Sequence, residues 1–257
     1  MVLAIDIGNI STTIALFRED GGLLFQSELG TDLKMTDDRC AIDLVGVFQL
    51  YQAELPSVKG SILSSVVPPI TAVYVRTLKR LIGKQPLLVG PGLKTGLNIK
   101  AEIHNQLGSD IVASAVAAVA LYPTPAIVIN SRTAVTFSYM SANTFEGCAI
   151  MPGMDIALDA LSRYGAQLPQ ISMAQVNTPL GRNTVDSMRA GVLYGYSGAF
   201  DRVIESLEEA AGAPALTVVA TGSHTPEFYQ HCRREIRYDH DLLVKGLHLL
   251  YQKNTHR

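Results

Sequence analysis

The hydrophobic and polar positions of this chain form two similar series of elements, each led by a strand–turn–strand. In the first series, alternating and continuous apolar runs predict strands, and apolar positions spaced at helical intervals predict two helices. The expected strands run from Met1 to the turn near Gly8, then over Thr12–Phe17, Leu23–Leu29, Ser61–Val67 and Gln85–Val89. The expected helices cover Ala41–Leu55 and Ile70–Ile82, and Pro68 and Pro69 open the second.

An alanine-rich segment, residues 108–121, predicts a buried helix at the end of the first series, and Pro123 and Pro125 follow it. We therefore expect two domains, residues 1–121 and 122–257. In the second, strands are expected from about Ala126 to Ile150 and over Leu216–Ala220. Helices are expected over Asp155–Ser162, Thr184–Ala211 and Leu242–Gln252.

Composition narrows the class of protein. The 257 residues are 47% apolar and 17% charged, which suits two similar domains or one large α/β unit. A net charge of −2 offers no basic field for nucleic acid. The three cysteines are scattered without CxxC spacing, which indicates neither a disulfide scaffold nor a zinc site. With no signal-peptide pattern and no apolar run of about 18 residues, we expect a cytoplasmic protein that does not enter a membrane.

The two strand–turn–strand segments differ in their chemistry. The first, Val2–Thr13, carries Asp6 and Gly8 at its turn, and the second, Ala126–Thr136, carries Asn130 and Arg132 there. A carboxylate at a strand end can hold magnesium through water, and a glycine lets backbone amides approach phosphate. The first turn therefore predicts a phosphate site with Asp6, Gly8, Asn9, Ser11, Thr12 and Thr13. An ordinary hairpin with polar turn residues is the alternative.

Short motifs extend this picture along nearly the whole chain. They are D-I-G-N (Asp6–Asn9), S-S-V-V-P-P (Ser64–Pro69), G-P-G-L-K-T-G-L-N-I (Gly90–Ile99), P-G-M (Pro152–Met154), G-R-N-T (Gly181–Thr184), G-x-L-Y-G-Y (Gly191–Tyr196), A-T-G (Ala220–Gly222) and K-G-L (Lys245–Leu247). In this order and spacing the chain resembles the type III pantothenate kinases and the related Bvg accessory factor proteins. The resemblance implies an α/β, actin-like ATPase (ribonuclease H-like) fold with two βββαβα domains.

The resemblance also implies an activity and a set of roles. Family members transfer the γ-phosphate of ATP to pantothenate, giving 4'-phosphopantothenate on the way to coenzyme A. They work as homodimers with magnesium and a monovalent cation, potassium or ammonium. By resemblance, Asp110 is the general base within the substrate motif Gly108, Ser109, Asp110 and Ile111. Thr133 contacts phosphate, Gly222 lies on the adenosine side, and Thr184 touches substrate across the dimer. Helix capping is the alternative role for both Asp110 and Thr184.

Several residues depart from the family pattern at the expected site. Ile111 replaces an arginine that suits an anionic substrate. Asn130 replaces the aspartate of the monovalent-cation position, and Arg132 replaces a phosphate-turn glycine. Ile10, Ala101 and Ser223 replace a polar residue, an aromatic residue and a glycine.

Two interpretations of Arg132 remain open. Its side chain either plugs a dead nucleotide site, paired with Asp6 or Asp110, or substitutes for the missing cation. Three functions follow from these departures: a pantothenate kinase with impaired or lost catalysis, a non-catalytic dimer that binds a metabolite or a regulatory partner, and a kinase for a less anionic substrate.

Overall fold

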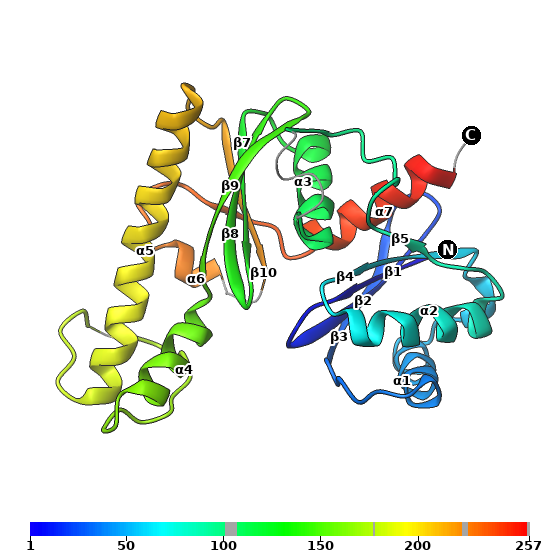
Figure 1. Ribbon diagram of the computed structural model, residues 1–257, viewed down its shortest axis with the longest axis horizontal. Helices are drawn as coiled ribbons and strands as arrows, with labels where there is room; N and C mark the ends of the chain where they lie inside the picture. The colour runs from blue at the N-terminus through cyan, green and yellow to red at the C-terminus, as the bar shows by residue number, and fades with distance from the viewer. Residues whose placement is uncertain (101–106, 177, 223–225, 256–257) are drawn as a thin grey trace. The chain divides into compact units, whose positions relative to one another are not determined.

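The structure, a computed structural model, describes residues 1–100, 107–176, 178–222 and 226–255, which divide into two compact units (Figure 1). The first unit comprises Met1–Leu97, Ala101–Ala117 and Asp241–Arg257, and the second comprises Asn98–Lys100 and Ala118–His240. The expected division after residue 121 differs from this chiefly at the C-terminus. Helix α7 (Leu242–Thr255) belongs to the first unit because Leu243, Leu247 and Leu250 are buried there with Ala4 and Ile62.

The first unit is built on a five-stranded sheet with the strand order β3-β2-β1-β4-β5. Its strands are β1 (Val2–Ile7), β2 (Ser11–Phe17), β3 (Leu23–Gly30), β4 (Gly60–Ser65) and β5 (Leu87–Leu88). Strand β2 runs antiparallel to both β1 and β3, and β4 and β5 continue the sheet parallel to β1. Successive side chains of a strand point to opposite faces, so Leu3, Ile5 and Ile7 share one face of β1, and Ala4 and Asp6 share the other.

Helices cover both faces of this sheet. On the face of Leu3 and Ile5, the buried cluster includes residues of α1 (Asp37–Leu50) and α2 (Pro68–Ile82). On the face of Ala4, it includes α7 and the first part of α3 (Ser109–Leu121). Asp6 therefore points to the face covered by α3 and α7. The alanine-rich sequence of α3 allows close packing: a Cβ atom on Gly246 of α7 would overlap the carbonyl oxygen of Ala113.

The second unit repeats this connectivity. Its six-stranded sheet has the order β11-β10-β7-β8-β9-β6, in which β7, β8 and β9 form the antiparallel part and β10 and β11 run parallel to β7. The strands are β6 (Asn98–Ile99), β7 (Ala126–Ser131), β8 (Ala134–Ser141), β9 (Thr144–Pro152), β10 (Thr217–Gly222) and β11 (Arg237–Tyr238). The order β9-β8-β7-β10-β11 matches β3-β2-β1-β4-β5 strand for strand, so the expected repeat is confirmed.

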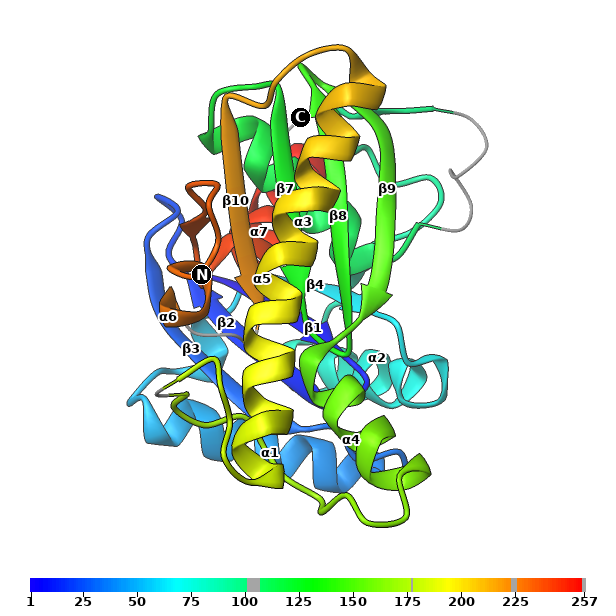
Figure 2. The same ribbon diagram turned by 90° about the vertical axis from the view of Figure 1, so that its left-hand side faces the viewer.

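Three helices belong to the second unit: α4 (Met154–Tyr164), α5 (Thr184–Ala211) and α6 (Pro226–Tyr229). Figure 2 shows α5 lying along one face of the sheet, where Phe200 and Ile204 are buried against Phe137 of β8. The short β6, β11 and α6, and a 3-10 turn at Leu55–Ser57, were not expected from the sequence. Elements of two to four residues leave no periodicity that a sequence could reveal.

Helix α1 begins four residues before its expected start and ends five residues before its expected end. Its N-cap is Thr36, whose side-chain oxygen accepts a hydrogen bond from the Arg39 amide at 3.3 Å. Gln52 follows with φ of 53°, in the left-handed region, so the chain turns out of the helix there. The apolar residues at 53 and 55, which suggested a longer helix, pack against the core from the connecting segment instead.

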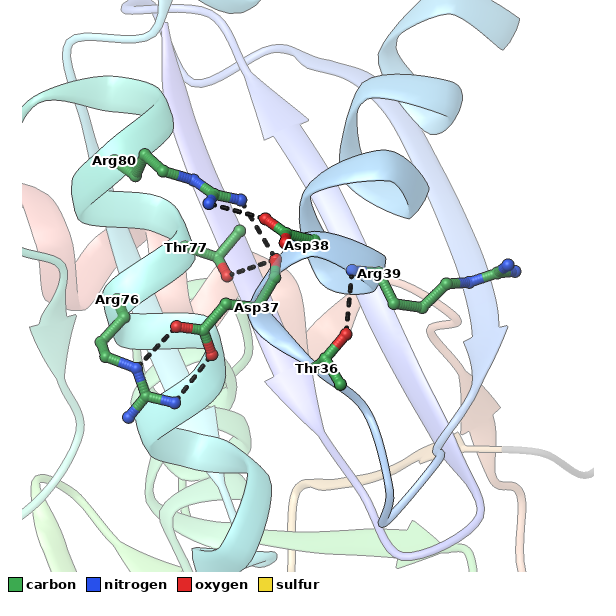
Figure 3. A network of polar contacts seen from close by, with 7 residues as sticks. All are labelled: Thr36, Asp37, Asp38, Arg39, Arg76, Thr77 and Arg80. Atoms are coloured by element: carbon green, nitrogen blue, oxygen red, sulfur yellow. Dashed lines mark hydrogen bonds and ion pairs between the residues drawn. The ribbon is translucent and has the colours of Figure 1, made fainter.

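Polar contacts tie α1 to α2 at their outer ends (Figure 3). Arg76 donates to both carboxylate oxygens of Asp37 at 2.7 Å, and Arg80 donates to Asp38 at 2.8 Å. The Arg76 guanidinium hydrogen-bonds Asp37 and holds the pKa of that carboxyl below its usual value. Exposed pairs of this kind contribute little each. The hydroxyl of Thr77 also donates to the Asp37 carbonyl at 3.1 Å. The network fixes the two helices on the face of the sheet opposite to Asp6.

Candidate functional site

The first hairpin places its polar side chains at the end of β1. The amide of Gly8 donates to the Ser11 carbonyl at 2.9 Å, which closes the turn between β1 and β2. Asp6 is 1% exposed and lies in register with Thr13 of β2 and Ser64 of β4, which are also buried. Asn9 is exposed and Ser11 half-buried, at the rim of the turn. The turn therefore combines a buried carboxylate with an exposed tip, and its role as a phosphate site stays a prediction.

The substrate motif is attached to this hairpin's sheet through serine hydroxyls. Ser64 donates from its Oγ to the Ser109 Oγ at 2.9 Å, and the Ser65 amide donates to the same oxygen at 3.0 Å. Ser109 in turn donates to the Ser65 carbonyl at 3.2 Å. Because Ser64 is the register partner of Asp6, these bonds bring Asp6 and the first turn of α3 to the same end of the sheet. Ser64 belongs to the motif S-S-V-V-P-P, but nothing in that motif alone indicates this contact.

Asp110 is the second residue of α3 and not its N-cap, which corrects the capping interpretation. Helix α3 begins at Ser109, so Gly108 precedes it. The Asp110 carboxylate bends back, because a Cβ atom on Gly108 would lie 2.5 Å from its Oδ1 and 3.8 Å from the Cδ1 of Ile111. A carboxylate in a first helical turn is favoured by the helix dipole. The expected base thus stands beside an apolar side chain where the family has an arginine.

The second hairpin has the same scaffold with different side chains. The Arg132 amide donates to the Ala134 carbonyl at 2.9 Å, and Asn130 is 4% exposed, in register with Thr136 and Thr221. Arg132 and Thr133 are half-buried. Among the described residues other than glycine, positive φ occurs at Gln52 and Ala142, so Arg132 has an ordinary backbone conformation. The glycine of the family is therefore replaced here without backbone strain, and the change concerns space and charge.

Two glycines of the expected motifs support the second hairpin. Gly222, at the end of β10, has φ of 118°, and a Cβ atom there would overlap the Ser131 carbonyl oxygen. Gly153, in P-G-M, donates its amide to the Thr133 carbonyl at 2.9 Å, and a Cβ atom there would overlap the Arg132 carbonyl oxygen. Both motifs are thus explained by close backbone approach. Ala101 and Ser223, two of the noted departures, lie outside the described residues.

Thr184 is the first residue of α5 and does not cap it. The cap is Asn183, whose side chain accepts a hydrogen bond from the Asp186 amide at 2.9 Å, so the capping interpretation of Thr184 is wrong. Thr184 is exposed and borders a hollow of about 570 Å³ in the second unit. The hollow is lined by residues of α4, of α5 and of the segment between them: Leu161, Leu168, Gly181, Arg182, Asn183, Thr184, Ser187 and Met188.

Comparison with known proteins identifies the family. The family model for type III pantothenate kinase matches residues 2–206. The chain belongs to the type III pantothenate kinase family. The enzyme of this name from Listeria monocytogenes serotype 4a is 36% identical over 255 residues, covering 99% of this chain and 98% of the relative. The type III pantothenate kinase of Bacillus cytotoxicus is 34% identical, covering 99% of this chain and 97% of the relative.

Solved structures place this type III pantothenate kinase family member in the actin-like ATPase fold. The activator of the 2-hydroxyisocaproyl-CoA dehydratase from Clostridium difficile with bound ADPNP superposes with a TM-score of 0.57 at 9% identity, covering 98% of this chain and 94% of that one. Component A of the (R)-2-hydroxyglutaryl-CoA dehydratase from Acidaminococcus fermentans has a TM-score of 0.55 at 13% identity, covering 97% and 96%. The expected fold class is confirmed.

Membership gives the general chemistry of the family. Kinases on this ATPase fold use ATP with a divalent metal ion, and the family acts on the small molecule pantothenate. Within the described part of the chain, no helix has the length and apolar character needed to cross a membrane. The roles assigned to individual residues, the monovalent cation and the homodimer stay predictions.

Proposed function

We propose that this chain keeps the scaffold and the first hairpin of a type III pantothenate kinase but transfers phosphate to pantothenate weakly or not at all. One observation carries the proposal: a neutral amide, Asn130, and a cation, Arg132, replace the carboxylate and the glycine of the second hairpin. Asn130 is buried, so solvent screens the loss of the carboxylate charge less than it would at the surface. The first hairpin, by contrast, retains Asp6 and Gly8, and its departure from the family pattern is Ile10.

The first unit supports the phosphate chemistry. Asp6 is a buried carboxylate at a strand end, which fits a magnesium ion held through water. Asp110 would take the proton of the pantothenate hydroxyl as its oxygen attacks the γ-phosphorus of ATP. The bond from that phosphorus to the β,γ-bridging oxygen breaks, and ADP leaves. The Ser64–Ser109 hydrogen bond supports this arrangement by holding the first turn of α3 at the end of the sheet that carries Asp6.

The second unit supports the loss. A carboxylate at position 130 would be buried among Thr136 and Thr221 and would need a positive partner, which a monovalent cation supplies in the family. Asn130 removes that charge and offers one neutral carbonyl oxygen. We therefore propose that this protein does not depend on potassium or ammonium. Thr133 remains available for a phosphate contact.

The position of the Arg132 side chain determines whether the nucleotide site is blocked or whether the guanidinium replaces the monovalent cation. As a plug, its long side chain fills the space that a glycine would leave for phosphate. As a built-in cation, its guanidinium takes the place of the ion and the site stays active. We favour the plug because phosphate turns depend on close backbone approach, and a side chain of this size prevents it.

A non-catalytic homodimer that binds a metabolite or a regulatory partner in the cytoplasm is the second candidate function. Large apolar side chains are exposed on α4, on α5 and just before α5, namely Leu161, Tyr164, Leu180 and Tyr194. Exposed apolar residues favour an interaction surface where they are contiguous. A kinase for a less anionic substrate is the third candidate, favoured by Ile111 beside the expected base.

Calorimetric titration with Mg–ATP, followed by a phosphoryl-transfer assay with pantothenate, tests the proposal. We expect weak or no ATP binding and little turnover, with or without potassium or ammonium. Tight binding with normal turnover would refute the loss of function, and turnover that still requires potassium would refute the built-in cation. Turnover with a neutral analogue of pantothenate but not with pantothenate would establish the third candidate.

Reversion separates a blocked site from a decayed one. The double variant Asn130→Asp, Arg132→Gly should restore nucleotide binding if the remaining groups are intact. Asn143→Asp is the matched control for the first substitution, because it adds one negative charge, as Asn130→Asp does, at an exposed loop of the same sheet. If the double variant binds no better than this control, more of the pocket is lost than this hairpin.

A further inference from the structure

The residue that follows the third strand makes the same backbone contact in both units. In the first unit, the Thr31 amide donates to the Ile10 carbonyl at 2.8 Å, directly after Gly30 pairs with Ser11. In the second, the Gly153 amide donates to the Thr133 carbonyl at 2.9 Å, directly after Pro152 pairs with Ala134. Thr31 and Gly153 are therefore equivalent by strand register. Each hydrogen-bonds the turn of its own hairpin.

Thr31 makes a second connection that Gly153 cannot make. Its hydroxyl donates to the Gly8 carbonyl at 2.8 Å and lies 3.0 Å from the Thr12 hydroxyl. At Gly153 no side chain fits, because a Cβ atom would overlap the Arg132 carbonyl oxygen. The first hairpin is thus held at two of its carbonyl groups, those of Gly8 and Ile10. At the equivalent residue of the second hairpin, Gly153 holds the Thr133 carbonyl through its amide.

These two bonds fix the direction of amide groups in the first turn. In a trans peptide the C=O and the following N–H point in opposite directions. A Gly8 carbonyl held by Thr31 therefore turns the Asn9 N–H away from Thr31, and an Ile10 carbonyl held by Thr31 does the same for the Ser11 N–H. Aligned backbone N–H groups of a turn are what binds phosphate oxygens.

We propose that Thr31 is a positioning residue of the phosphate hairpin, acting through the Gly8 and Ile10 carbonyls to orient the Asn9 and Ser11 amides. The proposal rests on the proposed function in one respect, namely that ATP phosphates meet this turn. Thr31 lies outside every motif in the sequence, and its role follows from the hydrogen bonds alone. Thr31 would act through the turn and not by touching nucleotide or substrate.

Thr31→Val is the test variant, because valine keeps the shape of threonine and removes the hydroxyl. Thr31→Ser keeps the hydroxyl and serves as the rescue. Thr77→Val is the matched control: it removes the same kind of side-chain to backbone bond, from Thr77 to the Asp37 carbonyl, on the far face of the same sheet. All three are also made in the Asn130→Asp, Arg132→Gly background, which is expected to bind nucleotide.

The first measurement is amide hydrogen exchange by NMR in the protein without ligand. The Gly8 amide, bonded to the Ser11 carbonyl, should exchange about fivefold faster in Thr31→Val, as expected for one lost hydrogen bond. It should stay within about twofold of the parent in Thr31→Ser and Thr77→Val. Equal exchange in Thr31→Val and the parent would overturn the proposal, whatever the protein binds.

The second measurement is the dissociation constant for Mg–ATP in the background that binds. It should rise about fivefold in Thr31→Val and return with Thr31→Ser, while Thr77→Val leaves it unchanged. Faster exchange with an unaltered dissociation constant would overturn the orienting role of Thr31. If no background binds Mg–ATP, the premise that ATP phosphates meet this turn fails, and the exchange experiment alone decides whether Thr31 holds the turn.

Discussion

Asn130→Asp would place a carboxylate where the side chain is 4% exposed. Burial disfavours the charged form, and about two to three units of pKa rise correspond to about 3–4 kcal/mol of lost stability at neutral pH. A raised pKa of an acid means that stability is intact below its unfolded value, about 4, and is lost as pH rises to the folded value. We therefore expect near-normal stability at pH 4 and the full penalty at pH 8.

The identity of the positive partner then separates the two interpretations of Arg132. If the guanidinium occupies the cation position, the single variant is compensated and its stability does not depend on potassium. Adding Arg132→Gly should then reveal the full loss of stability caused by the buried carboxylate. Potassium at a hundred times its dissociation constant should restore about 2.7 kcal/mol of the free energy of unfolding. If Arg132 points elsewhere as a plug, the single variant already shows the penalty and the response to potassium.

Thermal unfolding in potassium chloride and in tetramethylammonium chloride is the assay. A change of 1 kcal/mol shifts Tm by about 2–4 °C in a chain of this size, so the penalty should exceed about 6 °C. Asn143→Asp, exposed between β8 and β9, should change stability by less than about 0.5 kcal/mol. A double variant that is as stable as the parent at pH 8 in tetramethylammonium, and is not stabilised by potassium, would show that the carboxylate at position 130 needs no positive partner.

Three further outcomes are expected. Gly222→Ala should destabilise the protein by more than about 2 kcal/mol in chemical denaturation, because of its φ of 118° and the overlap with Ser131, whereas Gly191→Ala, in open space on α5, should be neutral or stabilising. Ile111→Arg should tighten pantothenate binding in calorimetry at least tenfold if the site takes an anion; no change would mean that residue 111 does not meet the carboxylate. Burial raises the pKa of the Cys40 thiol to about 11, so iodoacetamide at pH 8 should label Cys40 only when the protein unfolds. Because the thiol of the unfolded chain ionises at about pH 8.5, the free energy of unfolding should fall as the pH rises above that value. Rapid labelling of the folded protein would contradict this.

The sequence predicted most of the fold because its signals are local. Continuous apolar runs gave the strands of both hairpins, and prolines marked the start of α2. The position of α7 could not be predicted in this way. Its amphipathic pattern shows that one face is buried, but the partner strands, β1 and β4, lie some 180 to 240 residues earlier in the chain. Only the folded chain shows which unit a terminal helix completes.

In the candidate site too, local features could be predicted from the sequence, and contacts between distant residues could not. Asp6 and Asn130 could be placed at strand ends from their motifs, and the structure puts both in buried positions. The contacts that hold the site together join residues distant in sequence: Ser64 and Ser109 are 45 positions apart, and Thr31 and Gly8 are 23 apart. A single sequence has no pattern for such pairs. The cap of α5 was missed by one residue, since Asn183 and Thr184 are both good capping residues.

The two hairpins are best compared by separating their backbones from their side chains. Arg132 has an unstrained backbone, and the second turn still receives the Gly153 hydrogen bond and still packs against Gly222. The backbone of the turn does not itself require an arginine at position 132. Apart from the Thr31 hydroxyl contact of the first hairpin, the hairpins therefore differ mainly in charge and volume at positions 130 and 132. Two substitutions should then suffice to restore nucleotide binding, unless Ile10 or Ile111 has independently removed it.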